Sequence, residues 1–383
     1  MTTTLNTEQH SARPVRIATR TVFFITGFGM SAWAPLVPFA KLRLQINDAS
    51  LGLMLLCLGI GSLLAMPLAA PMASRLGCRP VIIGGAVLLC LVMPALALTQ
   101  SSFSLGLALL LFGISLGAID ITMNIQAVAV EKASGRAMMS GFHGFFSIGG
   151  IAGAGLVSIL LWLGLSPFSS IAIAVALIVV LLVCTAGNLL SDRPAADGGP
   201  LFVRPRGKVM FIGLLCFILF LTEGAMLDWS ALFLTVERGL ESSKGGLGYA
   251  LFSIAMTIGR LNGDRLINAI GRYRTLLAGS LCASAGLALA IFINQPVITL
   301  LGFMLVGFGA SNLVPLLFSV VGNQTDMPPN LALAAISGVG YAGILAGPAL
   351  IGFIAHLTSL FAAFGCVALL LLVVTLSARR VTR

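Results

Sequence analysis

The sequence predicts an all-α membrane protein in which twelve helices cross the bilayer as two pseudo-symmetric six-helix bundles. Of its 383 residues, 58% are hydrophobic and only 9% are charged, and glycine contributes 44. Soluble domains carry about 25% charged residues, so most of this surface must face lipid. Small residues such as glycine are typical of contacts between membrane helices.

Twelve apolar stretches have the length of about 20 residues that a membrane span needs. The longest connection, residues 191–207, is rich in Pro, Gly and Asp and predicts a cytosolic linker. It separates an N-terminal bundle (17–190) from a C-terminal bundle (208–378), with cytosolic tails at 1–16 and 379–383. The predicted spans are 17–40, 50–73, 80–98, 103–130, 138–163, 168–190, 208–235, 246–268, 273–293, 297–322, 331–355 and 358–378.

The distribution of basic residues predicts the orientation of the chain. Lys and Arg gather on the cytoplasmic side of multi-pass proteins. Here most of the 22 Lys and Arg residues fall in segments on the same predicted side of the membrane. Both termini are therefore expected in the cytoplasm of a bacterial-type inner membrane. The net charge of +10 is explained by these loops and does not indicate nucleic acid. The exceptions are Arg260, within a span, and four residues on the outer side: Lys41, Arg43, Arg238 and Lys244.

The two halves repeat one another. Trp33 and Trp229 lie near the ends of spans one and seven, 196 residues apart, and Leu51-Gly52 matches Leu247-Gly248 at the same spacing. Parallel six-span repeats place a binding site near the bilayer midplane between the halves. The two tryptophans are candidate substrate ligands, because their rings stack on sugar faces; anchoring at the membrane interface is the alternative.

One polar stripe lies within the apolar stretch Gly113–Glu131. A carboxyl at bilayer depth costs about 2.5–3.5 kcal/mol and marks a functional site by default, so we expect Asp120 to couple transport to protons. A structural acid bonded to a neighbouring helix is the alternative. Asn124 lies one turn further on the same face and is a candidate substrate ligand. Glu131 ends this face and is expected to be a gate contact.

Span seven carries two more acids. Glu223 falls near the midplane and is the second candidate for proton coupling, whereas Asp228 is assigned to an outer gate or an inter-helix contact. Five residues turn a helix by about 140°, so the two acids do not share a stripe. Arg260 in span eight either pairs with one of these acids or snorkels and serves a gate together with Asp264.

Two further polar residues are candidate substrate ligands. His143 near the start of span five could relay protons, although a buried histidine is more often a packing residue. Asn312 falls in the middle of span ten. Gly113-Ile-Ser-Leu-Gly117 matches a hydrolase elbow, but it lies within a span rather than after a strand. Close helix packing is its expected role.

The loop after span two resembles the signature of the major facilitator superfamily. It reads Ala70-Pro-Met-Ala-Ser74-Arg75-Leu-Gly-Cys-Arg79, with Ser74 at the acidic position. The second copy, which begins at Gly259-Arg260, retains an acid at Asp264. The resemblance extends over the whole chain and implies the twelve-helix fold, transport by alternating access, and gating roles for Arg75 and Arg79.

Three segments are similar to the fucose-permease-related bacterial branch of that superfamily. They are Ala118–Asn124, His143–Gly149 and Glu223–Trp229. For fucose permease itself, the resemblance implies proton-coupled sugar uptake that uses acids in spans one and four. Asp120 approximately matches the second of these acids, but span one contains no Asp or Glu, so the two-acid scheme does not carry over.

The sequence thus predicts a proton-coupled secondary transporter, not an enzyme, that moves a small polar metabolite. A sugar or sugar derivative is the first expectation. Drug or metabolite efflux is the alternative, and a membrane-embedded receptor or enzyme is less favoured. The expected partners are the solute, protons and membrane lipid. No cofactor, metal or obligate protein partner is expected, since the seven cysteines form no CxxC pair and no Walker motif is present.

Overall fold

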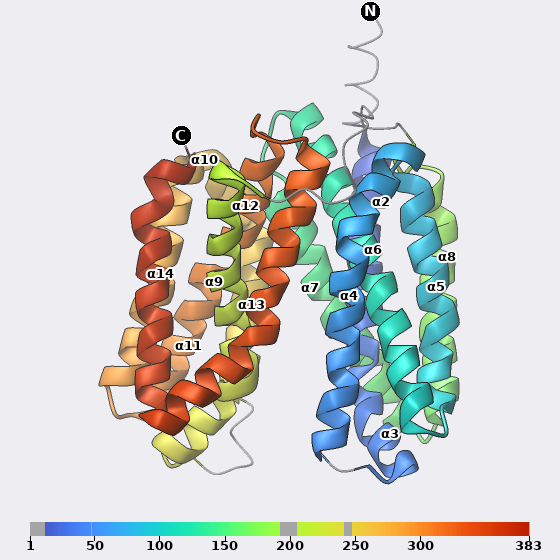
Figure 1. The fold of residues 1–383 in the computed structure, drawn as a ribbon, viewed down its shortest axis with the longest axis horizontal. Coiled ribbons are helices and arrows are strands. Elements are labelled where there is room, and N and C mark those ends of the chain that lie inside the picture. The colour runs from blue at the N-terminus through green and yellow to red at the C-terminus, as the bar shows by residue number, and fades with distance from the viewer. Residues whose placement is uncertain (1–11, 47, 192–204, 241–246, 383) are drawn as a thin grey trace, which may run out of the picture. The chain divides into compact units, whose positions relative to one another are not determined.

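The computed structural model describes residues 12–46, 48–191, 205–240 and 247–382 of the chain. These residues form helices joined by short connections and contain no strand (Figure 1). Predictions for residues 1–11, for most of the linker 191–207 and for Lys244 fall outside them. The helices of the first half are α2 (Arg13–Ala32), η1 (Ala34–Leu36), α3 (Val37–Leu44), α4 (Asp48–Leu76), α5 (Cys78–Leu98), α6 (Ser102–Ser134), α7 (Met139–Trp162) and α8 (Pro167–Ala186).

The second half is also built of helices joined by short connections. Its elements are α9 (Gly207–Leu232), η2 (Phe233–Glu237), α10 (Leu247–Phe292), α11 (Pro296–Ala310), α12 (Leu313–Gly322), α13 (Pro329–Leu357) and α14 (Leu360–Thr382). Ten helices of the described chain are long and apolar enough to cross a membrane. The fold class that the sequence predicts is confirmed.

Four predicted spans differ in detail from the helices. Span one is α2, η1 and α3, and α2 begins at Arg13 because Pro14 suits the first helical turn. Spans eight and nine are two helices that follow one another without a loop within α10, and they meet at a kink at Gly271, whose backbone is non-helical at φ 83° and ψ 162°. Span ten is divided into α11 and α12.

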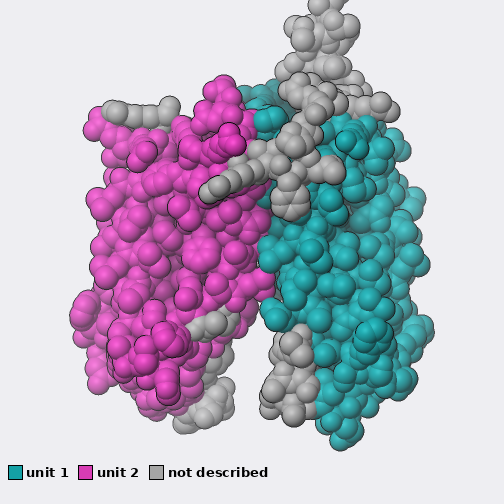
Figure 2. All heavy atoms as spheres, viewed as in Figure 1, with its two compact units in different colours: residues 1–135, 145–203, 328–334 teal, residues 136–144, 204–327, 335–383 magenta. Residues whose placement is uncertain are grey.

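The chain separates into two compact units (Figure 2). Unit 1 comprises residues 1–135, 145–203 and 328–334, and unit 2 comprises 136–144, 204–327 and 335–383. Two short segments belong to a different unit from their neighbours in sequence: residues 136–144 belong to unit 2 and residues 328–334 to unit 1. These are the segment leading into α7 and the segment leading into α13.

Glycines let α4 and α6 approach closely within unit 1. A Cβ atom on Gly113 would collide with the backbone of Leu58, and one on Gly117 would lie 2.6 Å from the carbonyl oxygen of Ser62. The Ser62 hydroxyl donates to the Gly113 carbonyl at 3.0 Å. Close packing of these helices accounts for the two glycines of the apparent hydrolase pattern, as the sequence predicts.

Candidate functional site

The polar stripe of α6 lies in unit 1. Asp120 is half-buried, and no hydrogen bond or ion pair reaches its carboxylate from the described residues. Asn124 is 1% exposed and its Nδ2 donates to the Asp120 backbone carbonyl at 2.8 Å. The two residues are therefore neighbours on one face, as the i, i+4 spacing predicts. The contact ties Asn124 to the backbone and leaves the Asp120 carboxylate available.

Two other polar residues of α6 are buried. Gln126 joins three segments, because its Nε2 donates to the Thr19 hydroxyl at 2.9 Å and its Oε1 accepts from the Leu190 amide at 3.2 Å. Glu131, a predicted gate contact, is 5% exposed, and its backbone carbonyl accepts from the Ser134 hydroxyl. Gln126 thus has a structural role, whereas the gating role of Glu131 stays a prediction.

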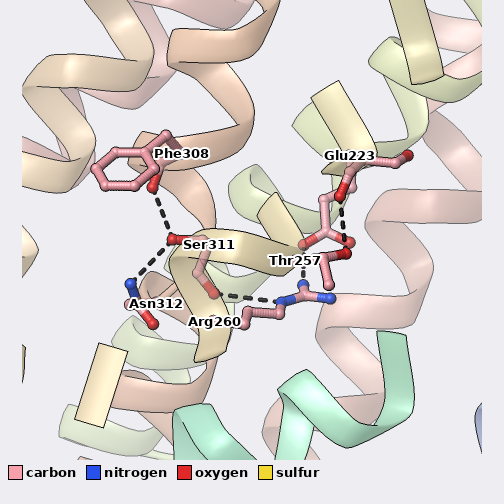
Figure 3. A network of polar contacts seen from close by, with 7 residues as sticks. Glu223, Thr257, Arg260, Phe308, Ser311 and Asn312 are labelled. Carbon is pink, nitrogen blue, oxygen red and sulfur yellow. Dashed lines mark hydrogen bonds and ion pairs between the residues drawn. The ribbon is translucent and has the colours of Figure 1, made fainter. Parts of the chain in front are cut away.

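A buried ion pair in unit 2 joins two predicted site residues. The Nη2 of Arg260 on α10 lies 2.9 Å from the Oε1 of Glu223 on α9 (Figure 3). The exposed fractions of the two side chains are only 11% and 21%. Of the two alternatives for Arg260, the structure shows the one in which it pairs with an acid. Each charge of such a buried pair needs the other, because a single unpaired charge would be costly to bury.

The ion pair continues into a break between α11 and α12. The Nε of Arg260 donates to the Ser311 carbonyl at 3.3 Å, and the Ser311 hydroxyl donates to the Phe308 carbonyl (Figure 3). Asn312, which the sequence places within a span, is the residue before α12. Its Nδ2 donates to the Gly259 carbonyl at 3.1 Å and to the Ser311 hydroxyl at 2.9 Å. Its Oδ1 has no hydrogen-bond partner among the described residues.

The first turn of α7 is held by α10. The backbone amide of Gly141 donates to Oδ2 of Asp264 at 2.8 Å, and the amide of Ala137 donates to Oδ1 of Asn268 at 3.1 Å. A carboxylate at a helix N-terminus satisfies free N–H groups and interacts favourably with the helix dipole. Asp264, a predicted gating residue, is therefore a cap supplied by a distant helix.

His143 lies one turn beyond this cap. Its ring packs edge-on against Phe318 of α12, with 6.0 Å between the ring centroids. This contact is consistent with a packing residue, the alternative to a transport role. Substrate contact by His143 stays a prediction.

The corresponding loop of the first half forms a neutral contact. Ser74 stands at the acidic position, and its hydroxyl accepts from Nδ2 of Asn330 in the first turn of α13 at 3.0 Å. Arg75 is exposed, and the backbone amide of Arg79 donates to the Leu190 carbonyl. The side chains of these two arginines make no hydrogen bond or ion pair within the described residues. Their gating roles stay predictions.

The two repeat-related tryptophans have related environments. Trp33 is 4% exposed, and Trp229 is half-buried against α13, where a Cβ atom on Gly352 would lie 3.0 Å from its ring. Both indole nitrogens are buried without a hydrogen-bond partner among the described residues. Asp228, next to Trp229, is exposed and is not part of the network of Glu223.

Two arginines outside the predicted site cap helix ends in both units. Arg43 donates to the carbonyls of Leu96, Ala97 and Thr99 at the end of α5. Arg238 donates to the carbonyls of Ala290 and Ile291 at the end of α10. From the sequence alone, these arginines are expected only to be basic residues on the outer side. Their spacing of 195 residues, close to that of the tryptophan repeat, is the signal that could have identified them.

Arg238 is also enclosed by aromatic rings. Its guanidinium carbon lies 4.9 Å from the ring centroids of Phe233 and of Phe361. Burial lowers the pKa of this arginine, as it does that of Arg43, and a guanidinium remains charged despite such a shift. Among the described residues, no group of three or more His, Cys, Asp or Glu side chains could hold a metal ion.

Comparisons with known proteins give a consistent picture. Residues 21–330 and 237–383 match the Major Facilitator Superfamily. An uncharacterized MFS-type transporter of Yersinia pestis is 61% identical over 368 residues, which cover 96% of each chain. Membrane protein MosC of Rhizobium meliloti is 33% identical over 343 residues, covering 88% of this chain and 83% of the relative. The E. coli fucose:proton symporter has a similar fold, with a TM-score of 0.79 at 18% identity, covering 96% of this chain and 98% of the symporter.

Proposed function

Because this chain belongs to the major facilitator superfamily of membrane transporters, we propose that it is a proton-coupled secondary transporter of a small polar metabolite. Alternating access between two six-helix bundles is the proposed mechanism. The proposed location is a bacterial inner membrane with both termini in the cytoplasm. The proposal rests mainly on the buried Glu223–Arg260 ion pair.

The ion pair offers a way to couple proton binding to a change in structure. Protonation of Glu223 would remove its charge and weaken the contact with Arg260, which is 2.9 Å long in this state. Asp120 is the second candidate, because its half-buried carboxylate accepts no hydrogen bond from the described residues. One carboxylate in each unit could therefore exchange a proton during transport.

The solute is proposed to be a sugar or sugar derivative. The likeness in fold to a fucose:proton symporter supports this choice. The indole N–H groups of Trp33 and Trp229 are unpartnered within the described residues, so they could donate to a polar solute while the rings stack on its apolar face. Asn124, His143 and Asn312 are the other proposed ligands.

The gate is proposed to lie at the start of α7, where Asp264 of α10 caps the helix. Asp264 holds the start of α7 through the Gly141 amide, and release of this contact would free the end of that helix. Glu131, Asp228, Arg75 and Arg79 remain further candidates for gating. The alternative function is proton-driven efflux, in which exposed Asp228 would attract a cationic compound.

Transport in proteoliposomes tests the proposal. An imposed pH gradient should drive accumulation of the solute, and a protonophore should abolish it. Glu223→Gln and Asp120→Asn should each stop gradient-driven accumulation while counterflow exchange persists. Asp326→Asn, the same change at an exposed loop residue, is the matched control and should transport normally. Accumulation that is independent of the gradient would overturn proton coupling, and proton-driven export would establish the efflux alternative.

A further inference from the structure

At the break between α11 and α12, a proline removes the amide that would donate to one backbone carbonyl if the helix continued through the break. In an α-helix the N–H of a residue donates to the carbonyl four residues earlier. The donor for the Ser311 carbonyl would be residue 315, which is a proline and has no N–H. The next hydrogen bond is formed, since the Leu316 amide donates to the Asn312 carbonyl at 3.0 Å. The Ser311 carbonyl is therefore released at this position.

Arg260 takes the place of the missing donor. Its Nε donates to the Ser311 carbonyl at 3.3 Å, while its Nη2 lies 2.9 Å from Oε1 of Glu223. The planar fork of a guanidinium can hold two acceptors at a fixed separation. One of these acceptors is a carboxylate that can be protonated, and the other is a backbone carbonyl that cannot.

Glycines on both sides of Arg260 allow the break to approach α10. A Cβ atom on Gly259 would collide with the Ser311 hydroxyl, and one on Gly263 would collide with Oδ1 of Asn312. The amide of Asn312 also donates to the Gly259 carbonyl, which fixes the position of the break along α10. The location of the Ser311 carbonyl relative to Arg260 is therefore determined by packing.

We propose that Pro315 is a positioning residue, which keeps the Ser311 carbonyl available to Arg260 and thereby holds the guanidinium against Glu223. The inference rests on the proposed role of Glu223 in coupling. When Glu223 binds a proton, the guanidinium loses its charged partner but keeps the carbonyl. Arg260 thereby links the carboxylate on α9 to the break between α11 and α12.

Pro315→Ala tests this role, because alanine restores an N–H that competes for the Ser311 carbonyl. With Arg260 less firmly held, Glu223 should bind protons more readily. We expect the pH of half-maximal gradient-driven uptake to rise by about one unit, a tenfold change in proton affinity. Pro94→Ala is the matched control, since Pro94 lies inside α5. It should leave the pH profile unchanged.

A thermal-unfolding cycle tests the same contact without transport. Glu223→Gln should lower the unfolding temperature in detergent micelles by clearly less in the Pro315→Ala background than in the wild-type background. The Pro94→Ala background should show the full effect. Equal reductions in all three backgrounds would overturn the positioning role. Unequal reductions together with uptake that does not depend on Glu223 would instead overturn the proposed coupling.

Arg260→Lys provides a second variant if Pro315→Ala does not fold. A lysine ammonium lacks the rigid fork and cannot hold both acceptors in the same geometry. It should raise the pH of half-maximal uptake in the same direction. A wild-type pH profile in this variant would show that simultaneous contact with the carbonyl and the carboxylate is not needed, and would overturn the proposal.

Discussion

Arg238 should contribute more to stability than an ordinary loop residue. The residue is 8% exposed. Its guanidinium donates to the backbone carbonyls of Glu237, Ala290 and Ile291 and to the side chains of Thr299 and Asn294. Replacement by alanine would leave the carbonyls at the end of α10 without their donor. It would also remove the contacts with two phenylalanine rings.

The magnitude follows from the groups that lose a partner. A buried acceptor left unpaired costs about 1–3 kcal/mol, and a cation–π contact contributes about 0.5–2 kcal/mol. Two carbonyls and the ring contacts together give about 4 kcal/mol for Arg238→Ala. With an unfolding entropy of about 2.1 cal/mol/K per residue, this corresponds to a decrease of about 5 °C in the unfolding temperature of a 383-residue chain.

Thermal unfolding in detergent, followed by tryptophan fluorescence, measures this effect. Arg238→Lys should recover only part of the loss, because an ammonium group cannot form the same fork. Arg274→Ala is the matched control, since this arginine is exposed and makes no hydrogen bond, ion pair or ring contact within the described residues. If Arg238→Ala and Arg274→Ala unfolded at the same temperature, the capping role would be wrong.

Two further substitutions test the packing around the site. Gly263→Ala should destabilise the protein by about 1–3 kcal/mol, because its new methyl group collides with Asn312. Gly84→Ala is the control and should not destabilise it, because a Cβ atom at Gly84 would meet nothing within 4 Å. Equal thermal stability of the two variants would contradict the reasoning. Gln126→Leu should cost about 1–3 kcal/mol, because it leaves the Leu190 amide without its acceptor. An unchanged unfolding temperature would show that this hydrogen bond contributes nothing.

The spans were predictable because a membrane imposes a length and a composition on each helix. Breaks within the helices were less predictable. Residues 297–322 are predicted as one span, but the structure divides them at Ser311 and Asn312, shortly before Pro315. The released carbonyl is stabilised by Arg260, which lies 51 residues away in sequence. Such a partner is set by tertiary packing and is not encoded in local periodicity.

The candidate site shows the same distinction. The adjacency of Asp120 and Asn124 follows from helical geometry alone and was predictable. The pairing of Arg260 with Glu223 was one of two alternatives, because sequence spacing on different helices does not determine which faces meet. Asp264 was recognised through a loop signature, but its role as a cap on α7 depends on a helix 123 residues away. Arg43 and Arg238 were missed because their charges resemble those of ordinary loops.

The cap formed by Arg43 has a consequence for bilayer thickness. Helix α5 has 21 residues and is about 31 Å long, close to the roughly 30 Å of a hydrocarbon core. Its final carbonyls are occupied by the guanidinium, so they do not need water at the lipid boundary. Without the arginine, these carbonyls would draw the headgroup region inward. An Arg43→Ala protein should therefore prefer short-chain lipids, whereas the native protein tolerates a thicker membrane.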